Sequence, residues 1–378
     1  MPGVPPGCIL AGGFAMKRYL IAPLIIVLLL FGWVGQAVAA PPASTLAGNA
    51  AGWLRGQQQP DGGFPGFQGG SDPGATADAA VAFAAAGIDP ASVKRDGHSI
   101  IDFLAASAGS YGTSAAGAAK LTLAAVASGE NPREFGGVNL ISQLQSHLDQ
   151  AGGLYDQQMF THAYAMLALV AAGETVPSNA VTALEHHQAT DGSWSFSGST
   201  DPGQGDSNTT AIAVQALEAA HSANSDSIER AFDYFKTVRM PDGSYTYQVG
   251  GPSPAAGDAN STALVIQALI AAGKAPEAGG AGSPVDALAH FQNPDGAFRF
   301  RDDTPADSAL ATVQAIPALM SMPLPVEPPG FSQADPPAIL PAAGQAHLAP
   351  VIPALLSMIG LGLLVMGAGL RRGLGSAK

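Results

Sequence analysis

Cysteine is almost absent from this chain of 378 residues, which contains a single thiol, Cys8. Cys8 lies in an N-terminal segment that we expect to be removed on export, so the mature protein would contain no cysteine. It would then have no disulfide, no thiol nucleophile and no thiolate metal ligand. Every enzyme class that depends on one of these groups is thereby disfavoured.

Charged and aromatic residues are also scarce, at 12% and 7% of the chain. The charge share is about half of that in ordinary soluble proteins. The net charge is −13, and no basic run exceeds two residues, so we expect no nucleic-acid partner. The hydrophobic share of 47%, mostly small residues, together with 47 Gly and 30 Pro, predicts close-packed helices joined by turns and argues against disorder.

The N-terminal region has the pattern of a secretory signal peptide. A basic pair at 17–18 precedes an apolar run over 19–34, and the small residues at 37–39 form a cleavage site. We therefore predict a signal peptide over residues 1–39. Met16 is an alternative translation start, and an uncleaved N-terminal anchor is the alternative to cleavage.

The C-terminal region has the pattern of an anchor. A Pro-rich linker is expected over 323–347, followed by an uncharged helix at 348–370 that is long enough to cross a bilayer and a basic cytoplasmic tail at 371–378. The string 340–344 (LPAAG) resembles the cell-wall sorting signal cleaved by sortases, except that Ala343 stands where that signal has Thr. We expect an exported protein held at the membrane or cell wall by its C-terminus, with the intervening region outside the cytoplasm.

The exported region is strongly acidic. All 29 acidic residues but only 11 of the 16 basic residues fall within residues 40–347, a net charge of −18. Such a charge favours solubility and disfavours anionic partners.

A sequence repeat covers the region between about residues 44 and 322. Strings built around Asp-Gly recur about every 40 to 53 residues. The clear copies are Gln58–Phe64, Gln188–Trp194, Met240–Tyr245 and Gln292–Phe298, and weaker copies are Ala108–Tyr111 and Ala151–Tyr155. These copies define six units, and repeats of this length are typical of stacked or circular architectures.

Each unit contains a partly polar helix, the Asp-Gly turn and a second helix that is almost wholly apolar. The apolar helices are expected near residues 79–86, 163–172, 211–220 and 263–272. A helix that is apolar on all sides is buried on all sides, so two concentric layers are predicted. The fold class expected over 40–322 is therefore all-α, an α6/α6 toroid, with an open solenoid as the alternative. The aromatic pairs Trp194/Phe196, Tyr245/Tyr247 and Phe298/Phe300 are expected to pack between the layers.

The string Gln188–Trp194 and its copies resemble the QW repeat of squalene and terpenoid cyclases, which also occurs in protein prenyltransferase β subunits. This resemblance implies the α/α-toroid fold. The string Ser261–Leu269 resembles the repeats of the transcobalamin and intrinsic-factor α-domain, a non-catalytic toroid. That second resemblance implies a cobalamin-like ligand, although no β-rich second domain is recognisable in this chain.

The catalytic signatures of these families are missing from the sequence. No DxDD acid occurs; its nearest counterpart, Arg301–Thr304, lies in a polar stretch. A cysteine-containing zinc site and a Cys-Gly-Glu-Gln thioester string are missing as well, and the adjacent His186 and His187 would diverge on a helix. We therefore predict neither a metal site nor an enzyme. If the protein were an enzyme, Asp307 or Asp78 would be the expected acid.

Polar residues recur on one stripe of the apolar helices, two helical turns apart in three consecutive units. The residues expected to face the interior of the ring are Asp78, His162, Asn208, Gln215, Asn260, Gln267, Asp307 and Gln314. The first member of each pair could instead cap its helix, and the glutamines could bond neighbouring helices. If they line a cavity, they form a ligand-binding site.

The sequence thus favours a surface-anchored binding module for a small, partly apolar ligand, such as a corrinoid-like molecule, or for a protein partner. One alternative is a terpenoid-cyclase-like or prenyltransferase-like enzyme with a non-standard acid. The other is a polysaccharide-active toroid, which would need paired carboxylates at its mouth.

Overall fold

A computed structural model of the chain describes residues 41–222, 224–249, 256–276 and 282–328. The expected signal peptide, the string 340–344, the C-terminal helix and the basic tail lie outside these residues. Within them, no helix is both long enough and apolar enough to span a membrane.

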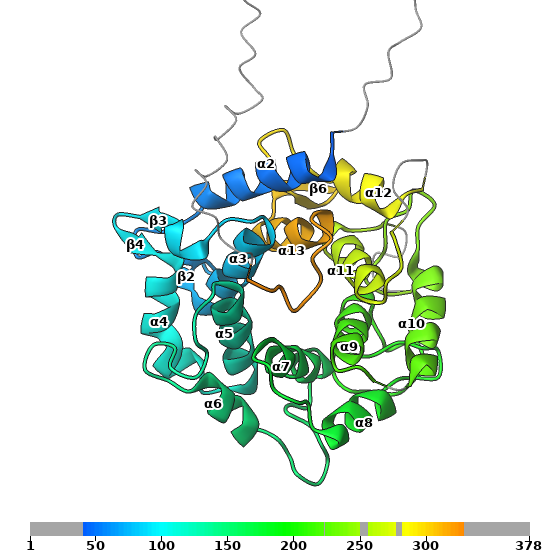
Figure 1. Cartoon of the computed structure of the whole chain (residues 1–378). Coiled ribbons are helices and arrows are strands. Elements are labelled where there is room, and N and C mark those ends of the chain that lie inside the picture. The colour runs from blue at the N-terminus through cyan, green and yellow to red at the C-terminus, as the bar shows by residue number, and fades with distance from the viewer. Residues whose placement is uncertain (1–40, 223, 250–255, 277–281, 329–378) are drawn as a thin grey trace, which may run out of the picture. The chain divides into compact units, whose positions relative to one another are not determined.

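Twelve α-helices of the described region alternate between an outer and an inner layer (Figure 1). The outer helices are α2 (Ala43–Gly56), α4 (Ile100–Tyr111), α6 (Leu140–Ser146), α8 (Ser178–His186), α10 (Ser225–Val238) and α12 (Pro284–His290). The inner helices are α3 (Pro73–Ala85), α5 (Ala115–Ala127), α7 (Met159–Ala171), α9 (Ser207–Ala219), α11 (Ala259–Ala271) and α13 (Ala309–Leu319).

The inner helices form a closed ring. Each contacts the next along the chain, and α13 returns to contact α3. In the outer layer, α12 likewise meets α2. The open solenoid is therefore wrong, and the expectation of a closed α/α toroid is confirmed.

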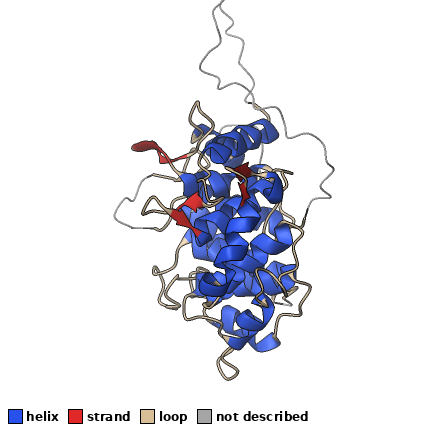
Figure 2. Ribbon diagram, turned by 90° about the vertical axis from the view of Figure 1, so that its left-hand side faces the viewer, coloured by secondary structure: helices blue, strands red, loops and turns tan. Residues whose placement is uncertain are grey.

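Burial separates the two layers. In α5, ten of thirteen residues are buried, whereas α4 buries only Ile100, Leu104 and Ala108 of its twelve. An inner helix is covered by two ring neighbours and by the outer layer, which buries it on nearly all sides. Small residues such as Ala allow these covered helices to pack closely. The strands form only short antiparallel hairpins (Figure 2). One 3₁₀ turn, Pro90–Ser92 (η2), lies in the loop between α3 and α4. The strands are β1 (Phe64–Pro65), β2 (Ser71–Asp72), β3 (Lys94–Arg95), β4 (His98–Ser99), β5 (Arg299–Arg301) and β6 (Thr304–Asp307).

The glutamine of the repeat joins neighbouring units. The Gln292 side chain donates to the carbonyl of Gly296 in its own turn (3.0 Å) and to that of Leu46 in α2 (2.8 Å). This pair of bonds links the last unit to the first and so helps to close the ring. Gln58 and Gln188 make the corresponding bonds, each to its own turn and to the unit that follows.

The glycine of the repeat is required by its conformation and by its surroundings. Gly192 has φ = +88°, and a Cβ there would lie 2.1 Å from the Arg230 carbonyl oxygen of α10. Gly62, Gly243 and Gly296 share the positive φ and the close approach. Glycine is required at these turns because it adopts a positive φ without strain and has no Cβ.

A threonine of the inner helix fastens each clear copy of the turn. The Trp194 backbone N–H donates to Oγ1 of Thr210 (2.9 Å), and this hydroxyl donates to the Asp206 carbonyl (2.6 Å). The same arrangement joins Phe64 to Thr76, Tyr245 to Thr262 and Phe298 to Thr312. Outer layer, turn and inner helix are thus held by one recurring network.

Two expectations about the repeats need correction. The weaker copy at Ala108–Tyr111 is not a turn, because these residues continue α4. The aromatic pairs do not pack between the layers as pairs: Trp194, Tyr245 and Phe298 are buried, but Phe196 and Tyr247 are 44% and 45% exposed.

Candidate functional site

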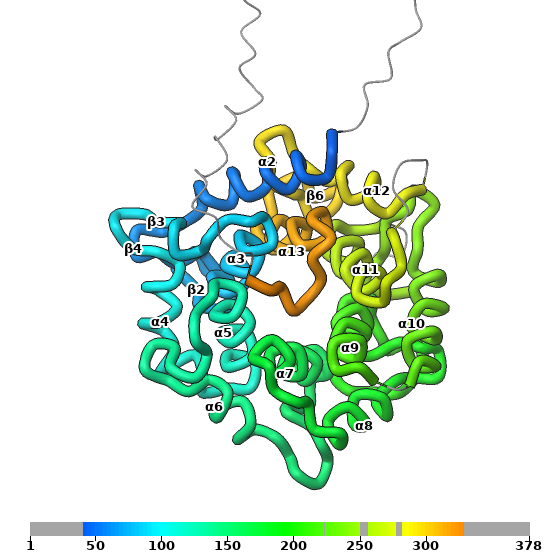
Figure 3. The backbone as a smooth tube through the Cα atoms, in the orientation of Figure 1, coloured from blue at the N-terminus to red at the C-terminus, as the bar shows by residue number. Residues whose placement is uncertain are grey.

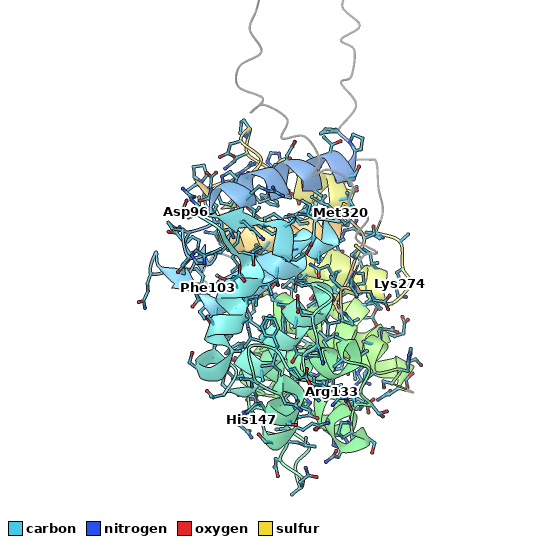
Figure 4. All side chains as sticks on the ribbon, turned by 60° about the vertical axis from the view of Figure 1, so that its left-hand side comes forward. Asp96, Phe103, Arg133, His147, Lys274 and Met320 are labelled. Atoms are coloured by element: carbon cyan, nitrogen blue, oxygen red, sulfur yellow. The ribbon has the colours of Figure 1, made fainter. Side chains whose placement is uncertain are left out.

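The segment after α13 enters the ring. Residues 320–326, which we call the strap, begin at Met320 (Figure 4) and turn into the space enclosed by the inner helices (Figure 3). The Leu324 backbone N–H donates to Oε1 of Gln215 in α9 (2.9 Å), and the Leu324 and Val326 side chains are buried. The strap therefore packs inside the ring, although its residues from 323 onward belong to the expected linker.

A central cavity of about 270 Å³ lies within the ring and is lined by all six inner helices and Leu324. Its lining residues lie in the first nine positions of their helices. Gln215, which holds the strap, is the ninth residue of α9. The strap thus forms the floor of the cavity on the side where the inner helices end.

A larger outer groove of about 970 Å³ adjoins this cavity on the side where α3 and α13 begin. It lies between the end of α2, the β1–β2 hairpin and the N-terminal turns of α3 and α13. The groove and the central cavity share four lining residues, Asp78, Lys120, Leu310 and Val313. A ligand could therefore extend from one into the other.

An ion pair stands at the junction of the two spaces. Nζ of Lys120 in α5 lies 2.9 and 2.7 Å from the two carboxylate oxygens of Asp78 in α3. Burial alone would lower the pKa of Lys120, but the Asp78 carboxylate outweighs burial and raises that pKa above its usual value. The Lys120 ammonium is therefore charged at neutral pH.

Aromatic side chains of α7, the helix next to α5 in the ring, form another part of the cavity wall. The rings of Phe160 and Tyr164 in α7 stack with centroids 4.9 Å apart. Burial raises the pKa of Tyr164, and also that of Tyr111 at the groove, so both phenols are neutral at physiological pH. These rings offer apolar faces with a polar edge to a bound molecule.

The three predicted glutamines differ in what they contact. Gln215 is fully buried and holds the strap. Gln267 lines the cavity while its amide donates to the Gln314 backbone carbonyl (3.0 Å). Gln314 also lines the cavity, and its Oε1 accepts from Asn260 Nδ2 (2.8 Å). Bonding between α11 and α13 and lining of the cavity therefore occur together.

The N-termini of α9 and α11 are not capped by the predicted stripe residues Asn208 and Asn260. Asp206 and Asp258 cap α9 and α11 by accepting from the backbone N–H groups of Thr209 and Ser261, each at 2.7 Å. Asn208 is thereby left to line the central cavity. The alternative that the first member of each pair caps its helix is therefore wrong, because Asp206, Asp258 and Ser308 occupy the N-cap positions.

His162 does not line the central cavity. It is fully buried, accepts a hydrogen bond at Nδ1 from the Tyr155 N–H (3.2 Å) and donates from Nε2 to the Ala180 carbonyl (3.0 Å). Burial lowers the pKa of His162 to about 4, so the ring is neutral. His162 thus ties α7 to α8 instead of facing a ligand.

Asp307 lies in β6, exposed at the rim of the outer groove, where its Oδ1 accepts from Asn293 Nδ2 (2.8 Å). Asp78 is the predicted residue that lines both the central cavity and the outer groove. Among the described residues, no group of three or more His, Cys, Asp or Glu side chains could hold a metal ion.

Lys120 was missed by sequence reasoning. It is the one charged residue in the otherwise uncharged stretch Ala115–Ala127, and that isolation is a usable signal. A lone cation within a helix buried on all sides needs a partner.

Several solved structures resemble this chain. Among them are the type II terpene cyclase MstE from Scytonema (17% identity, 74% of this chain and 97% of that chain, TM-score 0.53), an unsaturated glucuronyl hydrolase specific for heparin (12%, 74% and 95%, TM-score 0.55) and a protein from Actinoplanes (17%, 74% and 98%, TM-score 0.53). The chain has a terpenoid cyclase-like α/α-toroid fold. No family model and no curated protein matches its sequence. Since this toroid serves both a cyclase and a hydrolase, the fold leaves the function to the site.

Proposed function

We propose that the toroid is an exported, C-terminally anchored binding domain for a small, partly apolar ligand. The ligand would enter through the outer groove and place its apolar part in the central cavity. The observation that carries this proposal is the cavity itself, in which aliphatic and aromatic walls surround a few fixed polar groups. This composition is typical of small-molecule sites.

The polar groups of the cavity are already fixed by protein partners. Lys120 holds Asp78, and Gln267 is bonded to the Gln314 backbone. Groups fixed in this way can orient a ligand without being reorganised when it binds. This pre-organisation supports selective binding.

The same ion pair argues against an acid-catalysed cyclase. Protonation of an alkene needs a carboxylic acid that is protonated before the reaction. Asp78 instead lies 2.7 Å from the Lys120 ammonium, as the acceptor of an ion pair. Asp307 lies at an exposed rim, where an ordinary carboxyl group is too weak an acid for this step.

The strap supports a binding site with a single entrance. It forms the floor of the cavity and continues toward the expected linker and membrane anchor, so the groove on the opposite side is the entrance. An anchored toroid of this kind would present its groove away from the point where the chain leaves the ring.

Native mass spectrometry of the full-length protein, purified from its own host in lipid nanodiscs, tests the proposal. We expect a bound small molecule that is released when the protein unfolds, and its mass would distinguish a corrinoid from a smaller ligand. Protein that carries no small molecule and shows no thermal shift with a host metabolite extract would contradict the proposal. Capture of a protein alone would favour the partner alternative.

A second candidate function rests on the carboxylates of the outer groove. Asp72, Asp78 and Asp307 all line it, and polysaccharide cleavage uses paired carboxylates. Release of reducing sugar from a polysaccharide panel by the wild type, lost in Asp307→Asn, would support this alternative. Absence of release across the panel would leave the binding domain as the function.

A further inference from the structure

We infer that the ligand carries a cationic end, which binds in the outer groove between Phe67 and Asp307 while the apolar body extends toward the central cavity. This inference rests on the proposed function and adds the chemical class of the ligand.

The charge of the groove favours a cation. Its charged lining residues are three carboxylates, Asp72, Asp78 and Asp307, and one ammonium, Lys120. Lys120 and Asp78 neutralise each other, which leaves the two remaining carboxylates without a cation in the groove. These carboxylates accept hydrogen bonds from neutral groups, Asn293 Nδ2 and the Ala75 N–H. A cation bound there would add an opposite charge, whereas an anion would be repelled.

Aromatic surface lies beside these carboxylates. Phe67, in the loop between β1 and β2, is 99% exposed, the most exposed of the large hydrophobic side chains described. Tyr111 contributes a second ring to the lining of the groove. An aromatic face attracts an organic cation through the ring quadrupole, and a carboxylate nearby adds to this attraction.

The helix N-termini at the groove do not reverse this preference. The starts of α3 and α13 would attract an anion through their unpaired N–H groups. The Asp72 carboxylate already accepts from the Ala75 N–H (2.8 Å), and the Ser308 hydroxyl accepts from the Ala311 N–H (3.2 Å). At α3 the protein therefore supplies its own anion.

An apolar route leads from the groove into the ring. Leu310 and Val313 of α13 line both spaces, and Leu310 is 38% exposed. An apolar group attached to the cation would cover these side chains and approach the rings of Phe160 and Tyr164. The expected ligand class is thus an organic amine or quaternary ammonium compound with an apolar body.

Three water-soluble probes that share a benzyl group test this class: benzyltrimethylammonium, phenylmethanesulfonate and benzyl alcohol. Each is titrated calorimetrically into the full-length protein in zwitterionic nanodiscs, with empty nanodiscs as the blank. We expect the cation to bind roughly tenfold more tightly than the anion. Asp307→Asn and Phe67→Ala should each weaken cation binding several-fold.

Matched variants control for general effects. Asp303→Asn removes an exposed carboxylate of the same hairpin that pairs with Arg301, and Val249→Ala removes an exposed apolar side chain outside the groove. Both should leave cation binding unchanged. Equal loss in the test and control variants would overturn the inference.

The remaining outcomes separate this inference from the proposed function. Equal binding of all three probes, blocked by Val313→Trp in the cavity wall, would overturn the cationic class and leave the binding domain intact. Preference for the anion would do the same. No binding of any probe would overturn the inference, and the host ligand found by native mass spectrometry would then decide the proposed function.

Discussion

The backbone N–H of Leu324 donates a 2.9 Å hydrogen bond to Oε1 of Gln215, so the chain beyond the last inner helix is fastened to α9 inside the ring. Gln215 lies in the same stripe as Gln267, yet it serves the strap and Gln267 serves the cavity. The stripe of glutamines predicted from the repeat thus combines two structural roles.

Replacing Gln215 tests the role of the strap. Gln215→Leu leaves the buried Leu324 N–H without an acceptor, which should cost about 1–3 kcal/mol of unfolding free energy. Limited proteolysis should then cut between 320 and 328 faster than in the wild type. Gln143→Leu, on the exposed face of α6, should change neither measurement. Unaltered stability and proteolysis in Gln215→Leu would show that the strap does not depend on this bond.

The Asp78–Lys120 pair should be detectable as an energetic coupling. Asp78→Asn leaves the Lys120 ammonium without its counter-ion, and we expect a loss of about 1–2 kcal/mol, since both side chains are about a quarter exposed. The double variant Asp78→Asn/Lys120→Met should recover part of this loss. Chemical denaturation of the two single variants and the double variant measures the coupling. Additive losses would contradict a direct interaction.

The turn glycine should tolerate no β-branched side chain. Gly192→Val combines a positive φ with a Cβ 2.1 Å from a backbone oxygen, so we expect a loss of more than about 2 kcal/mol. Gly52→Ala is the control, because Gly52 is an exposed helical residue where an added Cβ would meet no neighbouring atom within 4 Å. It should stabilise α2 by up to about 1 kcal/mol. Equal melting temperatures for the two variants would contradict the turn geometry.

His162 should make stability depend on pH. Its pKa is about 4 in the folded state and near 6.5 when exposed, so between these values the unfolded chain binds more protons. The contribution of the neutral His162 ring to the unfolding free energy is therefore complete above pH 6.5. It declines by on the order of 3 kcal/mol as the pH falls to 4. The slope of unfolding free energy against pH should be shallower in His162→Gln than in the wild type. His186→Gln, at an exposed position, should have the same slope as the wild type. Identical slopes in all three proteins would contradict a neutral buried His162.

The fold could be predicted because its determinants are local and repeated. The glutamine, the Asp-Gly pair and the following aromatic residue lie within seven positions, and their bonds recur from unit to unit. The inner layer could be predicted as well, because the apolar pattern of its helices is also local and recurs in successive units. The copy at Ala108–Tyr111 failed because Gly and Ser within a helix look like a turn when they are read as short strings.

The site could be predicted only in part, because it depends on contacts between units. Asp78 was recognised at its helix start, but its partner Lys120 is 42 residues away and follows no repeat. The strap could not be predicted because its Pro-rich composition is typical of a linker. Leu324 and Val326 are buried only because the strap enters the space enclosed by the ring. Residues that occur once in a repeat protein are therefore the ones that the repeat pattern cannot place.

Filling the central cavity tests the proposed binding site most directly. The melting temperature is measured with and without a small-molecule extract of the host for the wild type, Val313→Trp and Val249→Trp. Val313 lines the cavity and the groove, whereas Val249 is exposed outside both. We expect the extract to raise the melting temperature of the wild type and Val249→Trp but not that of a folded Val313→Trp. An equal rise in all three proteins would contradict a ligand site inside the ring.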